Sequence, residues 1–286
     1  MMNLSKNILI TGSNGYIGKN LVNYCLSRGK KVVGLSRNSQ VECENPNGFF
    51  LKMDFSDWDE HDHIKYDQPD SCIHLAWRNG FHHQSTTHYE DLISHLNFIK
   101  NIIDLGIKNI AVLGTAHEIG YHNGPVDENT PTRPMNPYGI AKDFLRNAIL
   151  SYAETKNVKI KWLRVFYIYG DDERNQSVFT KLIHANNQGK LTFDMNSGEN
   201  LYDFIHIEML SKQIFMALDQ DDVTGVINCC SGKPVALKSM LEHYIKVNNM
   251  NIIPEYGKYP ERSYDSKAIW GNPDKINQIL NSHESQ

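Results

Sequence analysis

A tyrosine and a lysine four residues apart form the pair in this sequence best suited to acid–base chemistry. They are Tyr138 and Lys142, in the stretch NPYGIAK (136–142). In a helix both side chains lie on one face, and Asn136 and Pro137 suit the N-cap and the first helical position. An ammonium group and the helix N-terminus both favour a phenolate, so we expect the pKa of Tyr138 to fall below about 10 when a further cationic group is bound beside it. Tyr138 could then exchange a proton near neutral pH.

A hydroxyl residue, Thr115, ends the apolar run NIAVLGT (109–115). Threonine at the end of a strand usually serves the following turn, and Tyr-x-x-x-Lys alone is common by chance. The catalytic interpretation therefore depends on what the rest of the chain supplies. His117 and Glu118 follow Thr115 and could be a second acid–base pair, although a structural histidine beside the site explains His117 equally well.

A glycine-rich loop near the N-terminus supplies such a context. TGSNGYIG (11–18) follows the β-rich run NILIT (7–11) and opens a helical pattern. Gly12 suits a tight turn, Gly15 lets a phosphate approach the backbone, and Gly18 lets the helix lie close to the strand. The loop predicts a dinucleotide-binding site; the alternative is a tight turn without a ligand. The other residues expected in this site are Asn14, Tyr16 and Ile17.

The end of the second expected strand, KVVGLS (31–36), bears on the choice of cofactor. An acidic residue there usually binds the ribose 2′-hydroxyl of NAD, whereas an arginine favours the 2′-phosphate of NADP. This sequence has Ser36, which can donate a hydrogen bond to a phosphate, and Arg37, which can pair with it. We therefore expect NADP(H), with NAD(H) as the alternative, unless Arg37 is only a solvated loop residue.

Short apolar runs alternate with amphipathic helical patterns over the first 170 residues. The expected strands are 7–11, 31–36, 48–54, 71–77, 109–115 and 160–170, and the expected long helices are 87–105 and 137–156. This alternation predicts an α/β fold with a Rossmann-type doubly wound parallel sheet. We expect the Rossmann domain over 1–170, with a return of the chain at about 203–230, and a smaller substrate lobe from 171–202 and 231–286.

Composition argues against several kinds of protein. The 286 residues include 29 Lys and Arg against 33 Asp and Glu, so no nucleic-acid surface is expected. No apolar run approaches the roughly 18–20 residues of a membrane span. The cysteines lack the spacing of a zinc site, and neither HDH nor FHH (61–63 and 81–83) contains an i, i+4 histidine pair, so no metal is expected. We expect reduced thiols and a cytoplasmic protein; the cysteines are Cys25, Cys43, Cys72, Cys229 and Cys230.

Seven stretches occur in a characteristic order. They are TGSNGYIG, MDFSD (53–57), HLAW (74–77), GTAHEIGY (114–121), NPYGIAK, LRVFYIYG (163–170) and DFIHIEML (203–210). Together they resemble the extended short-chain dehydrogenase/reductase family, also called the NAD-dependent epimerase/dehydratase family. The resemblance covers about residues 3–235.

That resemblance implies roles for residues throughout the site. Tyr138 would be the proton donor or acceptor, and Thr115 would hydrogen-bond the sugar carbonyl or alcohol. Lys142 would hold the nicotinamide ribose and lower the pKa of Tyr138. The resemblance also places Asp54 and Phe55 at the adenine, and it places Leu75 and Ala76 along the ribose and phosphates of the cofactor.

Members of the family mostly act on nucleotide-diphosphate sugars. The 4,6-dehydratases carry Thr-Asp-Glu where this chain has Thr115, Ala116 and His117, which weighs against dehydration. The sequence resembles bacterial nucleotide-sugar 4-ketoreductases, such as those that make dTDP-fucose, dTDP-6-deoxytalose or CDP-abequose. We therefore expect NADPH-dependent reduction of the 4-keto group of a nucleotide-diphosphate 6-deoxy sugar, for surface polysaccharide synthesis. The alternatives are a C4-epimerase with tightly bound NAD and a non-catalytic nucleotide-binding regulator or assembly subunit.

Departures from the family pattern leave the binding of the diphosphate open. Tyr167 takes the place of a frequent asparagine, and Tyr202 takes the place of a frequent arginine. Arg262 and Arg78 are the candidate cations for the diphosphate, and His117 is a further candidate contact of the substrate. The resemblance also implies a homodimer, in which the two long expected helices pair with their copies.

Overall fold

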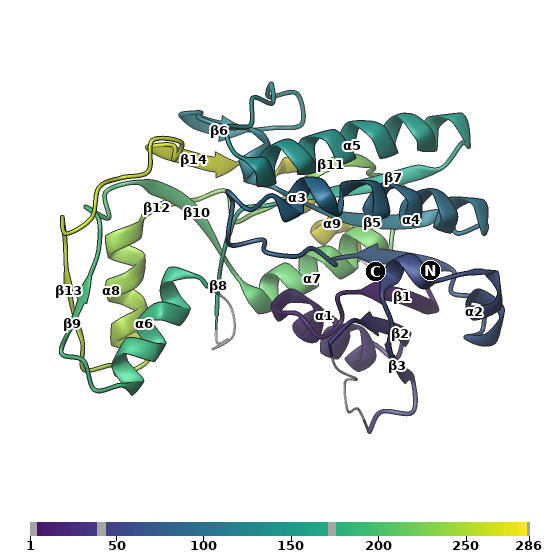
Figure 1. Cartoon of the computed structure of the whole chain (residues 1–286), viewed down its shortest axis with the longest axis horizontal. Helices are drawn as coiled ribbons and strands as arrows, with labels where there is room; N and C mark the ends of the chain where they lie inside the picture. The colour runs from purple at the N-terminus through teal and green to yellow at the C-terminus, as the bar shows by residue number, and fades with distance from the viewer. Residues whose placement is uncertain (1–4, 39–43, 171–175, 285–286) are drawn as a thin grey trace.

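The computed structural model describes residues 5–38, 44–170 and 176–284. Within them, a seven-stranded parallel sheet has the order β11-β7-β5-β4-β1-β2-β3 (Figure 1). Its strands are β1 Asn7–Thr11, β2 Lys31–Ser36, β3 Gly48–Lys52, β4 Ser71–His74, β5 Asn109–Thr115, β7 Lys159–Val165 and β11 Gly225–Cys229. The strand order reverses between β1 and β4, which is where such folds bind ligands. The expected α/β fold with a Rossmann-type sheet is confirmed.

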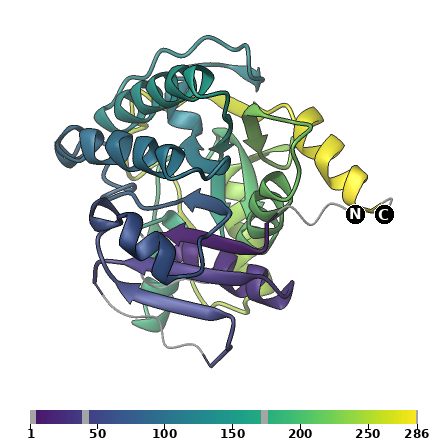
Figure 2. The ribbon, with the colours of Figure 1, turned by 90° about the vertical axis from the view of Figure 1, so that its right-hand side faces the viewer.

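Alternate side chains of the central strands enter two separate cores. Ile8 and Ile10 of β1 belong to one core, and Leu9 between them belongs to the other. Helices cover both faces of the sheet (Figures 1 and 2). On one face they are α1 (Tyr16–Ser27), α7 (Ile207–Leu218) and α9 (Asp274–Glu284), and on the other α4 (Leu92–Asp104) and α5 (Pro137–Thr155). Burial on both faces explains why these strands are continuous apolar runs rather than alternating ones.

Two expected elements are divided in the structure. The helix expected over 87–105 consists of α3 (Thr87–Glu90) and α4, which meet at Asp91. The run expected over 160–170 consists of β7 and the short β8 (Tyr167–Tyr169). Because Phe166 between them enters the core of the second lobe, β8 leaves the main sheet and pairs with β10 (Leu201–His206).

A second, mixed sheet forms the smaller lobe, seen at the left of Figure 1. Besides β8 and β10 it contains β6 (Gly124–Val126), β12 (Pro234–Ala236) and β14 (Ala268–Gly271). The lobe also contains α6 (Val178–Asn187), α8 (Leu237–Val247) and the strand pair β9 (Thr192–Asp194) and β13 (Ile253–Glu255). The division of the chain into domains stays a prediction. Three short helices complete the described chain: η1 (Phe55–Asp57), α2 (Glu60–Lys65) and η2 (Ala116–Glu118).

Four of the cysteines are buried and free. They are Cys25, Cys72, Cys229 and Cys230, whereas Cys43 lies outside the described residues. Burial raises the pKa of Cys25 and of Cys229 to about 12, and a protonated thiol is a poor nucleophile. None of the helices in the described parts of the chain has the length and apolar character to span a membrane. The expected cytoplasmic location stays a prediction.

Candidate active site

The glycine loop joins β1 to α1 and lies against the residues that follow β4. Gly12 has a φ of +71°, and a Cβ there would lie 2.9 Å from the backbone nitrogen of Ala76. A Cβ on Gly18 would clash with the carbonyl oxygen of Gly12, so glycine is required at both positions. Gly15 is the N-cap of α1, which begins at Tyr16. The amides of this first turn can donate to a phosphate, as a dinucleotide site requires.

Thr11 joins the glycine loop to the HLAW segment. The Thr11 hydroxyl oxygen accepts a 3.1 Å hydrogen bond from the amide of Ala76 and lies 2.8 Å from Nδ1 of His74. His74 Nε2 is in turn 2.8 Å from Nδ1 of His95. Burial lowers the pKa of His74 to about 3 and lowers that of His95 well below its usual value. Uncharged groups of Thr11 and His74 therefore join the glycine loop to the HLAW segment, which are two stretches expected to bind a cofactor.

The residues expected at the adenosine end lie after β2 and β3. Arg37 Nε is 3.7 Å from a carboxylate oxygen of Asp54, and the two side chains are 46% and 31% exposed. The other carboxylate oxygen of Asp54 accepts hydrogen bonds from the amide and hydroxyl of Ser56. Phe55 is buried and stacks on His95, with ring centroids 4.8 Å apart. Arg37 is thus already paired with a carboxylate.

Thr115, Tyr138 and Lys142 come together at the carboxyl end of β5. Asn136 caps α5, accepting a 2.9 Å hydrogen bond from the amide of Gly139, and this places Tyr138 in the first turn. Burial raises the pKa of Tyr138 to about 12, although a hydrogen bond with the Thr115 side chain lowers it. The tyrosine is therefore protonated near neutral pH, and its hydroxyl can donate a proton.

The Lys142 ammonium group does not offset the burial of Tyr138. Lys142 Nζ donates a 2.7 Å hydrogen bond to the carbonyl of Leu113 and lies 3.8 Å from the centroid of the Trp77 ring. Burial lowers the pKa of Lys142 to about 7, although Glu118 raises it. Burial is therefore the largest contribution to the pKa of Tyr138 in the protein alone, and the fall expected beside Lys142 and a cationic nicotinamide stays a prediction.

Glu118 is bound to the protein itself and positions Thr115. Its fully buried carboxylate accepts hydrogen bonds from the Thr115 amide (2.7 Å) and from Trp162 Nε1 (3.0 Å). The same carboxylate lies 3.4 Å from Nε of Arg164 and 3.5 Å from Nε of Arg146. Together with the Thr115 hydroxyl it forms a capping box at the start of η2. These contacts do not support the hypothesis that Glu118 is an acid–base group for the substrate.

Aromatic residues surround the ring of Tyr138. His83 is stacked on it, with centroids 5.4 Å apart and an interplanar angle of 10°. The rings of His88, His117 and Trp77 lie at 5.2, 5.8 and 6.1 Å. Sequence reasoning considered His83 only as a metal ligand in FHH and did not consider His88. The signal it lacked is the path of the chain after β4, which local patterns do not encode.

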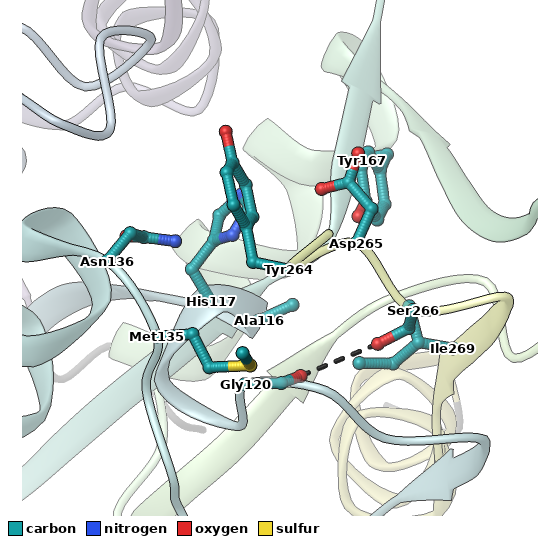
Figure 3. A pocket seen from close by; sticks show the side chains of 10 residues that line it. All are labelled: Ala116, His117, Gly120, Met135, Asn136, Tyr167, Tyr264, Asp265, Ser266 and Ile269. Carbon is teal, nitrogen blue, oxygen red and sulfur yellow. Dashed lines mark hydrogen bonds between the residues drawn. The ribbon is translucent and has the colours of Figure 1, made fainter. Parts of the chain in front are cut away.

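Residues of the second lobe complete this region. His117, Tyr167, Tyr264 and Asp265 line one small cavity, shown in Figure 3. The stacked pair of Tyr167 and Tyr202, with centroids 4.1 Å apart, lies at this boundary. Arg262 donates a 2.8 Å hydrogen bond to Asp265 and so lies beside this cavity. Three of the expected substrate residues, His117, Tyr167 and Arg262, therefore lie in or beside one cavity.

Arg78 is placed differently from the other expected substrate residues. Its guanidinium donates two 2.9 Å hydrogen bonds to Asp91 and one of 3.1 Å to Glu90. Its charge is therefore compensated by carboxylates of α3 and of the junction between α3 and α4. Arg262 is paired instead with Asp265 of the second lobe.

Comparisons with known proteins agree on family and fold. A family model described as "NAD dependent epimerase/dehydratase family" matches residues 8–230. A dTDP-6-deoxy-L-talose 4-dehydrogenase (NAD(+)) of Aggregatibacter actinomycetemcomitans is 43% identical over 272 residues, which cover 93% of this chain and 99% of that protein. The GDP-6-deoxy-D-talose 4-dehydrogenase of that organism is 21% identical over 280 residues, with 96% and 90% covered.

A solved structure shows the same fold. The UDP-N-acetylglucosamine 4-epimerase from Methanobrevibacter ruminantium M1, in complex with UDP-N-acetylmuramic acid, matches with a TM-score of 0.84 and 23% identity. The match covers 96% of this chain and 91% of that one. At this level of identity the likeness concerns the fold alone.

Proposed function

The chain belongs to the NAD dependent epimerase/dehydratase family, as its motifs predicted, and from that premise we propose that it is a nucleotide-sugar 4-ketoreductase. It reduces the 4-keto group of a nucleotide-diphosphate 6-deoxy sugar to an alcohol, reversibly. The convergence of Thr115, Tyr138 and Lys142 at the end of β5 carries this proposal. The 43% identity to a dTDP-6-deoxy-L-talose 4-dehydrogenase makes a dTDP-linked sugar the first candidate substrate.

The residues of the chain supply positioning and proton transfer. A nicotinamide dinucleotide supplies or accepts the hydride, and the first-turn amides of α1 beside Gly12 and Gly15 would hold its pyrophosphate. Tyr138, protonated near neutral pH because burial raises its pKa to about 12, donates its proton to the oxygen on C4 during reduction. Thr115 hydrogen-bonds the same oxygen, and the rings of His83 and Trp77 beside Tyr138 limit the access of water.

For the cofactor we propose NAD(H), and the expected preference for NADP(H) becomes the alternative. The relative that is 43% identical carries NAD(+) in its name. In this chain the carboxylate of Asp54 lies 3.7 Å from Arg37, so the charge of Arg37 is already compensated and the carboxylate would repel a 2′-phosphate bound there. Calorimetric titration should show NADH bound at least tenfold more tightly than NADPH, which is about 1.4 kcal/mol. Tighter binding of NADPH than of NADH would instead support NADP(H) as the cofactor.

Turnover assays test the proposed reaction. Purified protein is mixed with NADH and a dTDP-4-keto-6-deoxy sugar, and with the CDP-, GDP- and UDP-linked analogues alongside. We expect one NADH oxidised for each sugar reduced. Interconversion of C4 epimers of a UDP-hexose without net use of NADH would replace the proposal by an epimerase. Binding of nucleotide without turnover of any sugar would favour a non-catalytic regulator or assembly subunit.

We also propose a homodimer formed through α4 and α5. Ile93 on α4 is 56% exposed, and Ile140 and Phe144 on α5 are 40% and 50% exposed. Ile140 and Phe144 are four residues apart and form one apolar stripe, which a second copy could cover. Light scattering should give twice the chain mass of 32.8 kDa, and Phe144→Lys should shift it toward one chain. A constant single-chain mass over a wide concentration range would reject the dimer.

A further inference from the structure

The segment between β4 and α3 brings His83 to the catalytic tyrosine. Hydrogen bonds between polar groups of this segment close its turns. The amide of His82 donates a 2.8 Å hydrogen bond to the carbonyl of Asn79, and the side-chain amide of Asn79 donates one of 3.1 Å to the hydroxyl of Thr87. The hydroxyls of Ser85 and Thr87 are 2.9 Å apart. These contacts give His83 a defined position rather than a place on a loose loop.

His83 is held at α5 by its backbone and by its ring. The amide of Tyr138, in the first helical turn, donates a 3.1 Å hydrogen bond to the His83 carbonyl. The His83 ring is parallel to the Tyr138 ring, and its centroid is 4.0 Å from that of His117. From the second lobe, the Tyr264 ring approaches it edge-on at 6.3 Å. Figure 3 shows His117 and Tyr264 in the cavity that they share.

One polar atom of His83 has no hydrogen-bond partner among the residues that the structure describes. Within the described residues, Nδ1 of His83 is buried and forms no hydrogen bond. Buried polar atoms of folded proteins almost always have a partner, and one without a protein partner at a site is explained by a ligand or by water. The position of this atom, on a ring that is stacked on Tyr138, makes the substrate the partner to consider.

The protonation states of the two histidines identify the chemical group that fits them. Burial lowers the pKa of His83 to about 4 and lowers that of His117 well below its usual value, and the charge of Arg262 contributes to both shifts. Both imidazoles are therefore uncharged near neutral pH, and each offers one donor and one acceptor. A hydroxyl group can use both, whereas a phosphate offers acceptors only. The pair suits a sugar hydroxyl better than the diphosphate.

Sugar geometry then indicates which hydroxyl this is, on the premise of the proposed function. Tyr138 serves the oxygen on C4, and the neighbours of C4 are C3 and C5. In a 6-deoxy hexose C5 carries the ring oxygen and the C6 methyl group, so C3 bears the only hydroxyl on a neighbouring carbon. We propose that His83, with His117 beside it, binds the C3 hydroxyl of the hexose and thereby determines which nucleotide sugars are accepted.

A pair of substrates and two variants test this assignment. The substrates are a dTDP-4-keto-6-deoxy sugar and its 3-deoxy analogue. His83→Phe keeps a flat ring against Tyr138 but removes both nitrogens, whereas His83→Asn keeps an amide close to the place of Nδ1. For the wild type we expect kcat/KM to be about 30-fold higher with the 3-hydroxy sugar, since loss of a bonded hydroxyl leaves polar groups of the site unpaired. In His83→Phe this ratio should fall to about threefold or less, with partial recovery in His83→Asn.

His82→Asn is the matched control, because His82 is exposed, lies on the same segment and should keep the wild-type ratio. Equal losses with both sugars in His83→Phe would overturn the proposal, since His83 would then act on folding or on Tyr138 alone. Calorimetric dissociation constants for the corresponding pair of 4-hydroxy sugars give the same ratio without turnover. If the protein reduces neither sugar, the proposed function is wrong. The ratio of dissociation constants would still decide whether His83 recognises the C3 hydroxyl.

Discussion

The two sides of Thr115 are built from different kinds of residue. On the side of its hydroxyl, the rings of Trp77 and His83 lie against Tyr138, and burial shifts the pKa of His83 to about 4, of Lys142 to about 7 and of Tyr138 to about 12. Each of these shifts favours the uncharged form. Because burial disfavours the charged form of these groups, they can exchange protons with a substrate or form hydrogen bonds with it.

On the side of the Thr115 amide, the groups are charged and paired. The buried carboxylate of Glu118 lies between the guanidinium groups of Arg164 and Arg146, and Arg146 also contacts Asp143 at 2.6 Å. Such a network fixes geometry, because any movement would separate buried charges. On the proposed function, the uncharged side of Thr115 would perform the chemistry, while the charged side holds the β5–η2 junction in place together with the capping hydrogen bond of the Thr115 hydroxyl. The variants below test whether these two tasks are separate.

The largest effect is expected on the uncharged side, from Tyr138→Phe. The substitution removes only the hydroxyl, so folding and sugar binding should remain close to those of the wild type. General acid catalysis typically contributes about 10²- to 10⁴-fold, and kcat should fall by a factor in that range. Steady-state kinetics with NADH and a dTDP-4-keto-6-deoxy sugar measure it. Near-full activity of the variant would remove Tyr138 from the mechanism.

On the charged side, Glu118→Gln should act mainly on stability. Removing the carboxylate charge leaves Arg164 and Arg146 buried with less compensation, and breaking a buried ion pair in this way costs about 3–5 kcal/mol. Urea denaturation measures the change in the free energy of unfolding. The control is Asp104→Asn, in an ion pair with Lys156 whose side chains are about half exposed, where a loss under about 1 kcal/mol is expected. Equal losses in the two variants would contradict the structural role of Glu118.

Lys142→Met should separate stability from activity. Burial lowers the pKa of Lys142 from 10.5 to about 7, so the unfolded chain takes up a proton as the pH falls through 10.5 while the native protein takes it up only near 7. The lysine therefore costs stability increasingly from pH 10.5 down to 7. From the pKa difference alone the variant should gain roughly 4 kcal/mol at pH 7 and roughly 2 kcal/mol at pH 9, while turnover falls. A gain independent of pH would mean that the ammonium group is not the cause.

The sequence was sufficient for the elements whose burial follows a simple rule. Continuous apolar runs such as NILIT (7–11) and NIAVLGT (109–115) predicted the strands of a sheet covered on both faces. The glycine loop could be interpreted because Gly12 and Gly18 each have a local steric reason. Thr115, Tyr138 and Lys142 were found through spacing and resemblance, and the structure brings them together; their catalytic roles stay predictions.

The remaining features depend on contacts that sequence patterns do not contain. His83 reaches Tyr138 through turns closed by Asn79 and Thr87, and no periodicity indicates where that segment ends. The rise in the pKa of Tyr138 in the protein alone could not be predicted, because desolvation depends on what encloses the ring, and the enclosing histidines come from separate segments. The smaller contributions come from the hydrogen bond with Thr115, which lowers this pKa, and from the charge of Glu118, which raises it.

The smallest effect is expected at the boundary of the two sides, from Thr115→Val. Valine keeps the volume but loses the hydroxyl, so kcat/KM should fall about tenfold, which is about 1.4 kcal/mol. The hydrogen bond with Thr115 lowers the pKa of Tyr138, so the variant should require a higher pH to ionise the tyrosine, and the pH profile for sugar oxidation should move upward. Thr115→Ser retains the hydroxyl and should keep most of the activity.

The free energy of unfolding of Thr115→Val gives the stricter test of whether the two sides of Thr115 are separate. The backbone amide of Thr115 is bound by Glu118 at 2.7 Å, and valine leaves that amide in place. Valine loses only the capping hydrogen bond that the Thr115 hydroxyl accepts from the His117 amide, so the free energy of unfolding should fall by no more than about 0.5–2 kcal/mol. If the two sides are separate, Thr115→Val therefore affects the rate while Glu118→Gln affects the stability. A loss of stability in Thr115→Val as large as that in Glu118→Gln would show that the hydroxyl is part of the charged network, and the division proposed here would be wrong.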